Sequence, residues 1–241
     1  FEVILISSFG LIALGSRKIQ FDGAIKYAFL NLIGTMLFLI AVGYTYGIFG
    51  SLNMADIVLK ISASDQALPL NTLAILFFLA FSIKAAAFPV NFWLPASYHT
   101  PNFVISALFA GLMTKVGIYA ILRVLIYIMG EETQNFDEII LLVAALTMLT
   151  GAVGALAQVN LRRLLGFLVV AGIGFMMTGI AIGEIYSLAA TIIYAINSML
   201  IMALLYLTFG LMSKLANGRE MLGEVRGIYE KNLFLSAIIF I

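Results

Sequence analysis

Long apolar segments recur along the chain and limit its fold more than any other feature. Each has about 15–28 residues, so nearly all are long enough to cross the roughly 30 Å hydrocarbon core of a bilayer as helices. With 63% hydrophobic and 10% charged residues, the composition is typical of an integral membrane protein. The sequence predicts an all-α, polytopic transmembrane helix bundle. Its expected spans are 1–15, 24–49, 70–94, 102–129, 138–158, 164–182 and 185–213, with an eighth that begins near Asn232.

The remaining composition excludes several classes of protein. The net charge is only +1, which argues against nucleic-acid binding, because that function needs a basic face. The chain has no cysteine, so disulfides and thiolate metal sites are excluded. No metal-ligand cluster or nucleophile–base pair occurs within the apolar segments, which leaves little support for a membrane enzyme. We expect neither a metal nor a cofactor.

Charged loop residues predict the orientation of the helices. If the helices alternate in direction, nine basic residues fall on one side and two, Lys60 and Arg123, on the other. Since cytoplasmic loops carry an excess of Lys and Arg, the richer side is predicted to be cytoplasmic. Its nine residues are Arg17, Lys18, Lys26, Arg162, Arg163, Lys214, Arg219, Arg226 and Lys231. The opposite side gathers Asp56, Asp65, Glu131, Glu132, Asp137, Glu138 and Glu184, which we expect in solvated outer loops.

The stretch from Phe81 to Lys115 holds two lysines in apolar surroundings and three prolines between them. A lysine at the centre of a bilayer costs about 2.5–3.5 kcal/mol on insertion scales, so both should face a polar interior. Proline removes a backbone donor and clashes with the preceding turn, so the helix that carries Lys84 should break near Pro89. Broken helices in membranes are tolerated where the freed carbonyls line a wet cavity. The stretch therefore indicates ion handling.

Three ionisable groups are expected at one depth. Counted from the predicted cytoplasmic ends of their helices, Glu2, Lys84 and Lys115 lie 12–14 residues deep, which corresponds to about 20 Å. One acid and two amines in a common layer are suited to passing protons through water. The alternative is that the lysines extend to an interface and that Glu2 is itself interfacial.

Four long motifs then become recognisable: FEVILISSF, GSLNMADI, IKAAAFPVNFWLPASY and LFAGLMTKVGIYAILR. They resemble the antiporter-type subunits of Mrp cation/proton antiporters and of respiratory complex I. WLPASY is more similar to the D-type subunits of Mrp antiporters, since Ala96 stands where complex I commonly has aspartate. The resemblance implies a core of fourteen helices in two inverted repeats. The chain would carry the fifth helix to the start of the twelfth, with 1–129 in the first repeat and 138–241 in the second.

The resemblance also implies roles for the three ionisable groups. Glu2 matches the glutamate of the fifth helix, Lys84 the lysine of the broken seventh and Lys115 the lysine of the eighth. The expected function is a proton-translocating subunit of a multisubunit Na⁺ or K⁺/proton antiporter. It would work with other subunits in the lipid bilayer of a bacterial inner membrane. The alternatives are a proton-pumping subunit of complex I or of a membrane-bound hydrogenase, and a scaffold subunit that does not transport.

In the family, further polar residues continue the proton relay formed by these three groups, and this chain departs from the family pattern there. Relatives often carry histidine or lysine where this chain has Leu168, Asn197 and Met202. Either the relay is weakened, or it passes through waters held by Tyr194, Asn197 and Ser198. The lone histidine, His99, lies in the proline-rich hinge, where it is either a solvated loop residue or a point of proton entry.

Other residues are expected to have structural roles. The polar segment Ser51–Lys60 is too short to span and should form an interfacial helix begun by Ser51. Arg162 and Arg163 should anchor the topology, and Trp93 and Arg123 should lie at the membrane interfaces. Close helix packing is expected at Gly111, Gly117, Gly151 and Gly154.

Overall fold

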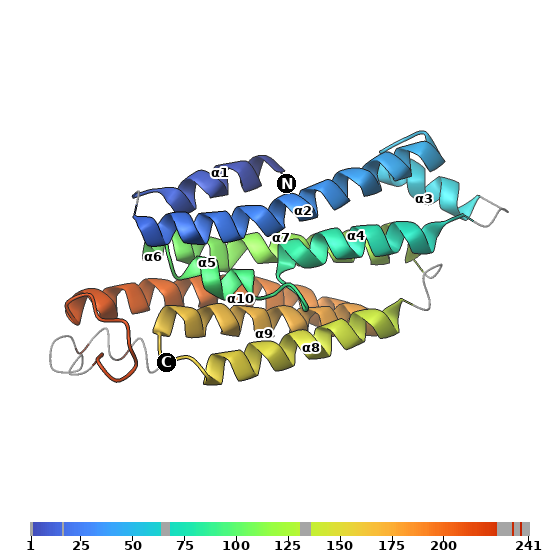
Figure 1. Ribbon diagram of the computed structural model, residues 1–241. Coiled ribbons are helices and arrows are strands. Elements are labelled where there is room, and N and C mark those ends of the chain that lie inside the picture. The colour runs from blue at the N-terminus through green and yellow to red at the C-terminus, as the bar shows by residue number, and fades with distance from the viewer. Residues whose placement is uncertain are drawn as a thin grey trace.

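The computed structural model describes residues 2–15, 17–63, 68–130, 136–225, 233 and 237, with the side chain of Glu2 outside that description. Apart from one isolated bridge between Asn160 and Met221, the regular structure of these residues is helical. The helices run along one common direction (Figure 1). They are α1 (Glu2–Ala13), α2 (Lys18–Phe49), α3 (Met54–Ser62), α4 (Leu70–Ala85), α5 (Trp93–Tyr98), α6 (Phe103–Leu108), η1 (Phe109–Met113), α7 (Thr114–Ile121), η2 (Leu122–Ile128), α8 (Asp137–Leu156), α9 (Leu161–Ile182) and α10 (Ile185–Leu215).

The predicted polytopic bundle is confirmed. Within the described residues, five helices are long enough and apolar enough to cross a membrane: Lys18–Phe49, Phe103–Ile128, Asp137–Leu156, Leu161–Ile182 and Ile185–Leu215. Two shorter apolar helices, Val3–Ala13 and Leu70–Ala85, accompany them. The eighth predicted span, near Asn232, begins outside the described residues.

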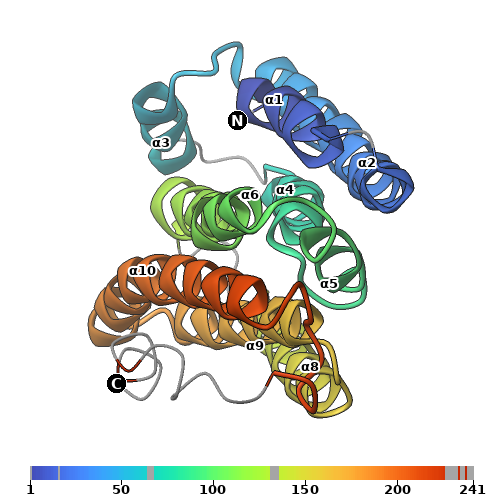
Figure 2. The same cartoon turned by 90° about the vertical axis from the view of Figure 1, so that its left-hand side faces the viewer.

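Viewed along its length, the bundle has three layers (Figure 2). α1, α2 and α3 form one layer, α4, α5 and α6 the middle layer, and α8, α9 and α10 the third. The middle layer packs on both sides, through α4 against α2 and through α5 against α9. Most of α4 is therefore buried, and the lysine that it carries lies inside the bundle rather than at its surface.

The predicted helix break is confirmed, but it begins earlier than Pro89. α4 ends at Ala85, and Ala86 has the left-handed conformation with φ of 62°. The connection to α5 is held by α8, since the Phe88 amide donates to Thr147 Oγ1 at 2.9 Å and the Asn91 amide group donates to Thr150 Oγ1 at 2.6 Å. A proline disfavours the helical conformation of the residue before it, so the chain leaves the helix ahead of Pro89. Residues 70–94 are not one continuous helix, and the helical rise from Ala96 to Lys84 does not apply.

The predicted span 102–129 is a single rod that contains two π-helical segments. Its segments α6 and α7 are α-helical, whereas η1 and η2 are π-helical. Short π segments inside α-helices occur frequently at functional sites. The sequence did not predict them.

The predicted close packing at glycine is confirmed where helices cross. A Cβ atom at Gly117 would lie 2.8 Å from the Ala85 amide nitrogen, and one at Gly151 would lie 2.5 Å from that of Ala171. Such distances leave no room for a side chain, so α4 approaches α7, and α8 approaches α9, at backbone contact. At Gly154 a Cβ would meet the Phe167 ring, and at Gly111 it would lie 3.2 Å from the Met199 carbonyl oxygen.

The polar segment after α2 forms the short helix α3, but Ser51 does not begin it. The cap is Asn53, whose side chain accepts a hydrogen bond from the Ala55 amide. Ser51 Oγ instead accepts from the Asn53 amide. Lys60 lies 2.8 Å from Asp56 and also donates to the Phe49 carbonyl oxygen, which ties α3 to the end of α2. The hydrogen bond from Lys60 lowers the pKa of the Asp56 carboxyl.

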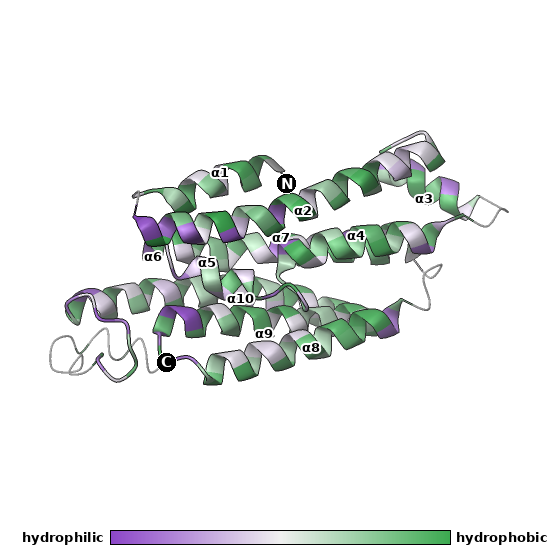
Figure 3. Cartoon of the chain, in the orientation of Figure 1, coloured by the Kyte–Doolittle hydropathy of each residue, from purple (hydrophilic) through white to green (hydrophobic). Residues whose placement is uncertain are grey.

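Polar residues gather at the helix ends, and the middle of the bundle is mostly apolar (Figure 3). The end that contains the α1–α2 turn also contains the start of α9 and the end of α10 (Figure 1). Seven of the nine basic residues named above belong to these segments, while Arg226 and Lys231 lie outside the described residues. Which side of the membrane this end faces remains a prediction.

Candidate functional site

Lys84 lies in the last turn of α4 and is only 4% exposed. Its Nζ donates to Thr35 Oγ1 on α2 at 2.7 Å. Gly34 makes room for the lysine, since a Cβ there would lie 3.3 Å from Lys84 Cε. A buried ammonium group persists only where acceptors replace its lost hydration. The site thus meets one condition for holding a charged lysine inside an apolar bundle.

Lys115 is 2% exposed and lies in the first turn of α7, directly after the π-helical segment η1. Its Nζ donates to the Ala110 carbonyl oxygen, five residues earlier, at 2.6 Å. The π-helical winding changes which amides the carbonyls of this segment meet, and the Ala110 oxygen accepts the ammonium group. The helix discontinuity and the buried charge therefore form one local arrangement.

The structure brings the two lysine-bearing segments together. Ala85, the residue after Lys84, packs against Gly117, two residues after Lys115. Both lysines consequently lie near the crossing of α4 and α7, while their common depth in a membrane stays a prediction. The third predicted member, Glu2, is at the first position of α1, and its side chain lies outside the described residues. Its pairing with Lys84 stays a prediction.

The observed position of Trp93 contradicts the prediction that it lies at the membrane interface. It is 1% exposed, and its indole Nε1 donates to the Ile83 carbonyl oxygen at 3.1 Å. Its ring meets Tyr27 and Tyr98 edge-on, at centroid distances of 5.3 and 5.8 Å. Tryptophan is buried when its N–H finds an acceptor, and here the broken helix supplies one beside Lys84.

His99 is not a freely solvated loop residue. It is partly buried, with Nδ1 2.9 Å from the Pro95 carbonyl oxygen and Nε2 3.3 Å from Arg163 Nη2. The arrangement fits a tautomer in which Nδ1–H donates to Pro95 and Nε2 accepts from Arg163. Burial, followed by the positive charge of Arg163, lowers the pKa of His99 below its usual value. A role for His99 in proton entry stays a prediction.

Arg162 has structural contacts that the sequence did not reveal. Its guanidinium donates to the carbonyl oxygens of His99 and Pro101 at 3.0 and 2.6 Å, and to Glu220 Oε1 at 2.7 Å. It also lies 3.5 Å from the centre of the Phe103 ring. Arg162 thus joins the α5–α6 connection to the segment after α10. The one sequence signal for these contacts was the proline-rich hinge, whose carbonyls need donors from elsewhere in the chain.

The residues of α10 that were predicted to form the inner part of the proton relay differ in their burial. Tyr194 is partly buried with its ring 4.7 Å from that of Phe175, Ser198 is buried, and Asn197 is exposed. Of the residues that depart from the family pattern, Leu168 is exposed and Met202 is partly buried. A relay through Tyr194, Asn197 and Ser198 stays a prediction.

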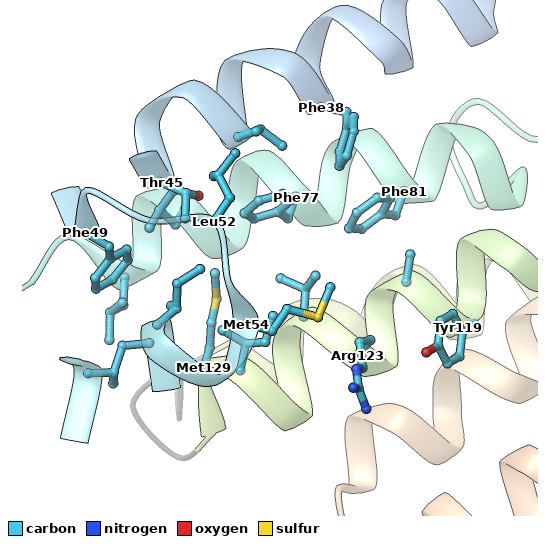
Figure 4. A pocket seen from close by; sticks show the side chains of 18 of the residues that line it. Phe38, Thr45, Phe49, Leu52, Met54, Phe77, Phe81, Tyr119, Arg123 and Met129 are labelled. Carbon is cyan, nitrogen blue, oxygen red and sulfur yellow. The ribbon is translucent and has the colours of Figure 1, made fainter. Parts of the chain in front are cut away.

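A separate cavity of about 470 Å³ lies between α2, α3, α4 and the helix that ends in η2 (Figure 4). Its wall is almost entirely apolar, with the rings of Phe38, Phe77 and Phe81 along one side. Arg123 also lines it, and its guanidinium lies 4.3 Å from the centre of the Tyr127 ring. The cavity is distinct from the polar surroundings of the Lys84 ammonium group.

Similar sequences come from bacterial antiporters. The chain is 37% identical over all 241 residues to the D-type subunit of the Na⁺/H⁺ antiporter of Alkalihalophilus pseudofirmus, and 37% identical to that of Bacillus subtilis. In both cases it spans 49% of the relative. The chain thus covers about half the length of these curated relatives.

Solved structures agree with the sequence relatives. The fold matches a chain of the Mrp complex from Dietzia sp. with a TM-score of 0.89 and 29% identity, over 99% of this chain and 45% of that one. It also matches a chain of the membrane-bound sulfane sulfur reductase, an archaeal respiratory membrane complex, with a TM-score of 0.83 and 23% identity, over 92% of this chain and 46% of that one. The second match concerns the fold alone. The family model described as NADH:quinone oxidoreductase/Mrp antiporter, transmembrane, matches residues 1–241, so the chain belongs to that family.

Proposed function

We propose that the protein containing this chain is a proton-translocating subunit of a multisubunit Na⁺ or K⁺/proton antiporter. The observation that carries the proposal is the pair of buried lysines, Lys84 and Lys115, each beside a helix discontinuity in an apolar bundle. The names of the relatives from Alkalihalophilus pseudofirmus and Bacillus subtilis support the same assignment. The protein would act with other subunits in a bacterial inner membrane, and its substrates would be protons and a monovalent cation.

Each lysine would bind and release a proton according to its acceptors. An opposite charge or a hydrogen-bond acceptor favours the ammonium form, and desolvation favours the neutral amine. Thr35 supplies an acceptor to Lys84, the Ala110 carbonyl supplies one to Lys115, and Glu2 would add a counter-charge to Lys84. Movement of the acid away from Lys84 would promote release of the proton, which Lys115 would then receive through intervening water.

The proposal is tested with Lys84→Ala and Lys115→Ala in the full-length subunit, assembled in its complex and assayed in everted membrane vesicles. Both variants should abolish cation/proton exchange while the complex still assembles. Lys26→Ala is a suitable control, because Lys26 is exposed and paired only with Asp22 four residues away among the contacts described. Exchange at the normal rate in both lysine variants would favour the scaffold alternative, for which Leu168, Asn197 and Met202 are the motivating departures.

A further inference from the structure

The ring of His99, in the connection from α5 to α6, lies between two groups of fixed hydrogen-bonding character. Its Nδ1 lies 2.9 Å from the Pro95 carbonyl oxygen, and its Nε2 lies 3.3 Å from Nη2 of Arg163 on α9. A carbonyl oxygen can only accept a hydrogen bond, and a guanidinium can only donate one. The neutral tautomer with its proton on Nδ1 satisfies both partners. The hydrogen bond from Arg163 therefore exists only while Nε2 carries no proton.

The histidine ring lies among positively charged side chains. Burial lowers the pKa of the ring most, and the positive charges of Arg163 and Arg162 on α9 and of Lys26 on α2 lower it further. Asp22 already binds Lys26, and Glu220 already binds Arg162. Protonation of the ring would consequently add a positive charge beside three others and would set a ring N–H against a guanidinium N–H.

The connection that carries His99 is held on α9 by a second contact. The Arg162 guanidinium donates to the carbonyl oxygens of His99 and Pro101 at 3.0 and 2.6 Å. Arg162 and Arg163 are adjacent in the first turn of α9. Repulsion at a protonated His99 would therefore act at the place where both arginines hold the connection.

Tyr98, the residue before His99, is fully buried and packs against two aromatic rings. The centre of its ring lies 5.8 Å from that of Trp93 and 5.7 Å from that of Phe109. Its carbonyl oxygen accepts from Ser106 Oγ at 2.7 Å. Closely packed interiors have little free volume and transmit strain, so a shift of the connection would displace both rings.

Each of these two rings adjoins the surroundings of one buried lysine. The Trp93 indole donates to the carbonyl oxygen of Ile83, the residue before Lys84. Phe109 begins η1 and precedes the residue whose carbonyl oxygen accepts from Lys115. Two short chains of contacts thus lead from the histidine to the two lysine-bearing segments.

We propose that the contact between His99 and Arg163 is a pH-sensitive latch on the α5–α6 connection. At neutral pH the neutral ring binds Arg163, and the connection stays packed on α9. At acidic pH the protonated ring repels the arginines, the connection loosens, and exchange through the two lysines slows. The effect on exchange rests on the proposed function, whereas the opening of the latch does not.

The latch would limit acidification of the cytoplasm. Gly23, near the start of α2, faces Thr100, since a Cβ there would meet the threonine hydroxyl. The connection therefore lies at the end of the bundle that the positive-inside prediction makes cytoplasmic. An antiporter that expels a cation carries protons inward, so its own activity lowers the cytoplasmic pH. The latch would slow exchange as that pH falls below about 6.5, the ordinary pKa of histidine.

The first experiment measures the opening of the latch without transport. Thr100 is 7% exposed, and its hydroxyl donates to the Ser97 carbonyl oxygen. Thr100→Cys is made in the full-length subunit without other cysteines, and the purified complex is treated with a methanethiosulfonate reagent. At about pH 5.5 this cysteine should react about fivefold faster beside His99 than in the His99→Gln background, whose side chain stays neutral. At about pH 7.5 the two rates should be equal. Comparison at one pH cancels the ionisation of the thiol.

The second experiment measures exchange, driven by a cation gradient, in vesicles with the same pH on both faces. Between about pH 7.5 and 5.5, wild-type exchange should fall about fivefold more than that of His99→Gln. His99→Arg stays charged, so its exchange should be slow throughout this range. Lys18→Gln is the matched control, because Lys18 is exposed at the same end of the bundle, and its exchange should fall as steeply as that of the wild type.

Two results would overturn the latch. One is equal reaction of Thr100→Cys at about pH 5.5 with and without His99. The other is a pH dependence of exchange in His99→Gln that matches the wild type. Should His99→Gln fail to assemble, Arg163→Gln tests the same contact: its cysteine should already react rapidly at about pH 7.5, and a slow reaction would refute the latch. Full activity of Lys84→Ala and Lys115→Ala would instead refute the proposed function and leave the labelling result unaffected.

Discussion

The Arg162 guanidinium donates to the Pro101 carbonyl oxygen at 2.6 Å, which joins the first turn of α9 to the connection between α5 and α6. The same guanidinium binds Glu220 beyond α10. Three segments distant in the sequence therefore meet at one side chain. This connection follows the broken helix and precedes the helix that carries Lys115, so Arg162 holds in place the segment that links the two lysines.

Replacement of Arg162 by glutamine should destabilise the complex. Glu220 would lose its charged partner, and two carbonyl oxygens would lose their donor. Both side chains of the ion pair are only partly buried, so we expect a cost of about 1.5–3 kcal/mol, as for a hydrogen bond to a charged group. We expect a lower thermal midpoint for the purified complex, with exchange lost at a lower temperature. Arg219→Gln is the matched control, since Arg219 is exposed and belongs to the same segment as Glu220. An unchanged midpoint for Arg162→Gln would contradict this role.

Replacement of His99 should remove a pH-dependent contribution to stability. The folded pKa of His99 is lower than 6.5, chiefly because of burial, so the folded state favours the neutral ring. This contribution is present above about pH 6.5 and is lost as the pH falls through the folded pKa. The thermal midpoint of the wild-type complex should thus fall more steeply than that of His99→Gln between about pH 6.5 and 5. Parallel curves would show that His99 does not titrate in this way.

Lys115→Arg distinguishes a proton carrier from a fixed charge. Arginine keeps the positive charge, but its guanidinium remains protonated in proteins. If Lys115 must release its proton, the variant should assemble and fail to exchange cations for protons in vesicles. Lys214→Arg, at the exposed end of α10, should be fully active. Normal exchange in Lys115→Arg would mean that only the charge is needed.

Glu2 and Lys84 should behave as one unit. Loss of the acid in Glu2→Gln removes a counter-charge from the amine, so protonation needs a higher proton concentration and the activity optimum should move to lower pH. Lys84→Ala should be inactive at every pH. The double variant should then be no worse than Lys84→Ala, because the acid acts through the amine. Independent, additive losses measured in vesicles would refute the pairing.

Cysteine labelling tests the orientation, because these 241 residues contain no cysteine of their own. Asn217→Cys, after α10, should react only with reagents that reach the cytoplasm. Glu184→Cys, between α9 and α10, should react only from outside. The reverse pattern would invert the predicted topology.

The sequence by itself determined the class of protein and the position of the buried charges. The lengths of the apolar segments are local quantities that the bilayer thickness converts directly into helices. Pro89 likewise predicted a broken helix, since its effect on the preceding turn depends on neighbouring residues alone. The cost of burying an amine identified Lys84 and Lys115 before any helix was placed, and four long motifs identified the family.

Only the tertiary structure decided which residues contact the buried lysines and where the broken helix ends. The last helical residue is Ala85 rather than a residue next to Pro89, and Thr147 and Thr150 from α8 bind the connection that follows. Trp93 is buried because the Ile83 carbonyl accepts its N–H, and Arg162 is more than a topology anchor because Pro101 and Glu220 meet it. These partners are distant in the sequence, so no local pattern specifies them, and each appears only when the helices pack.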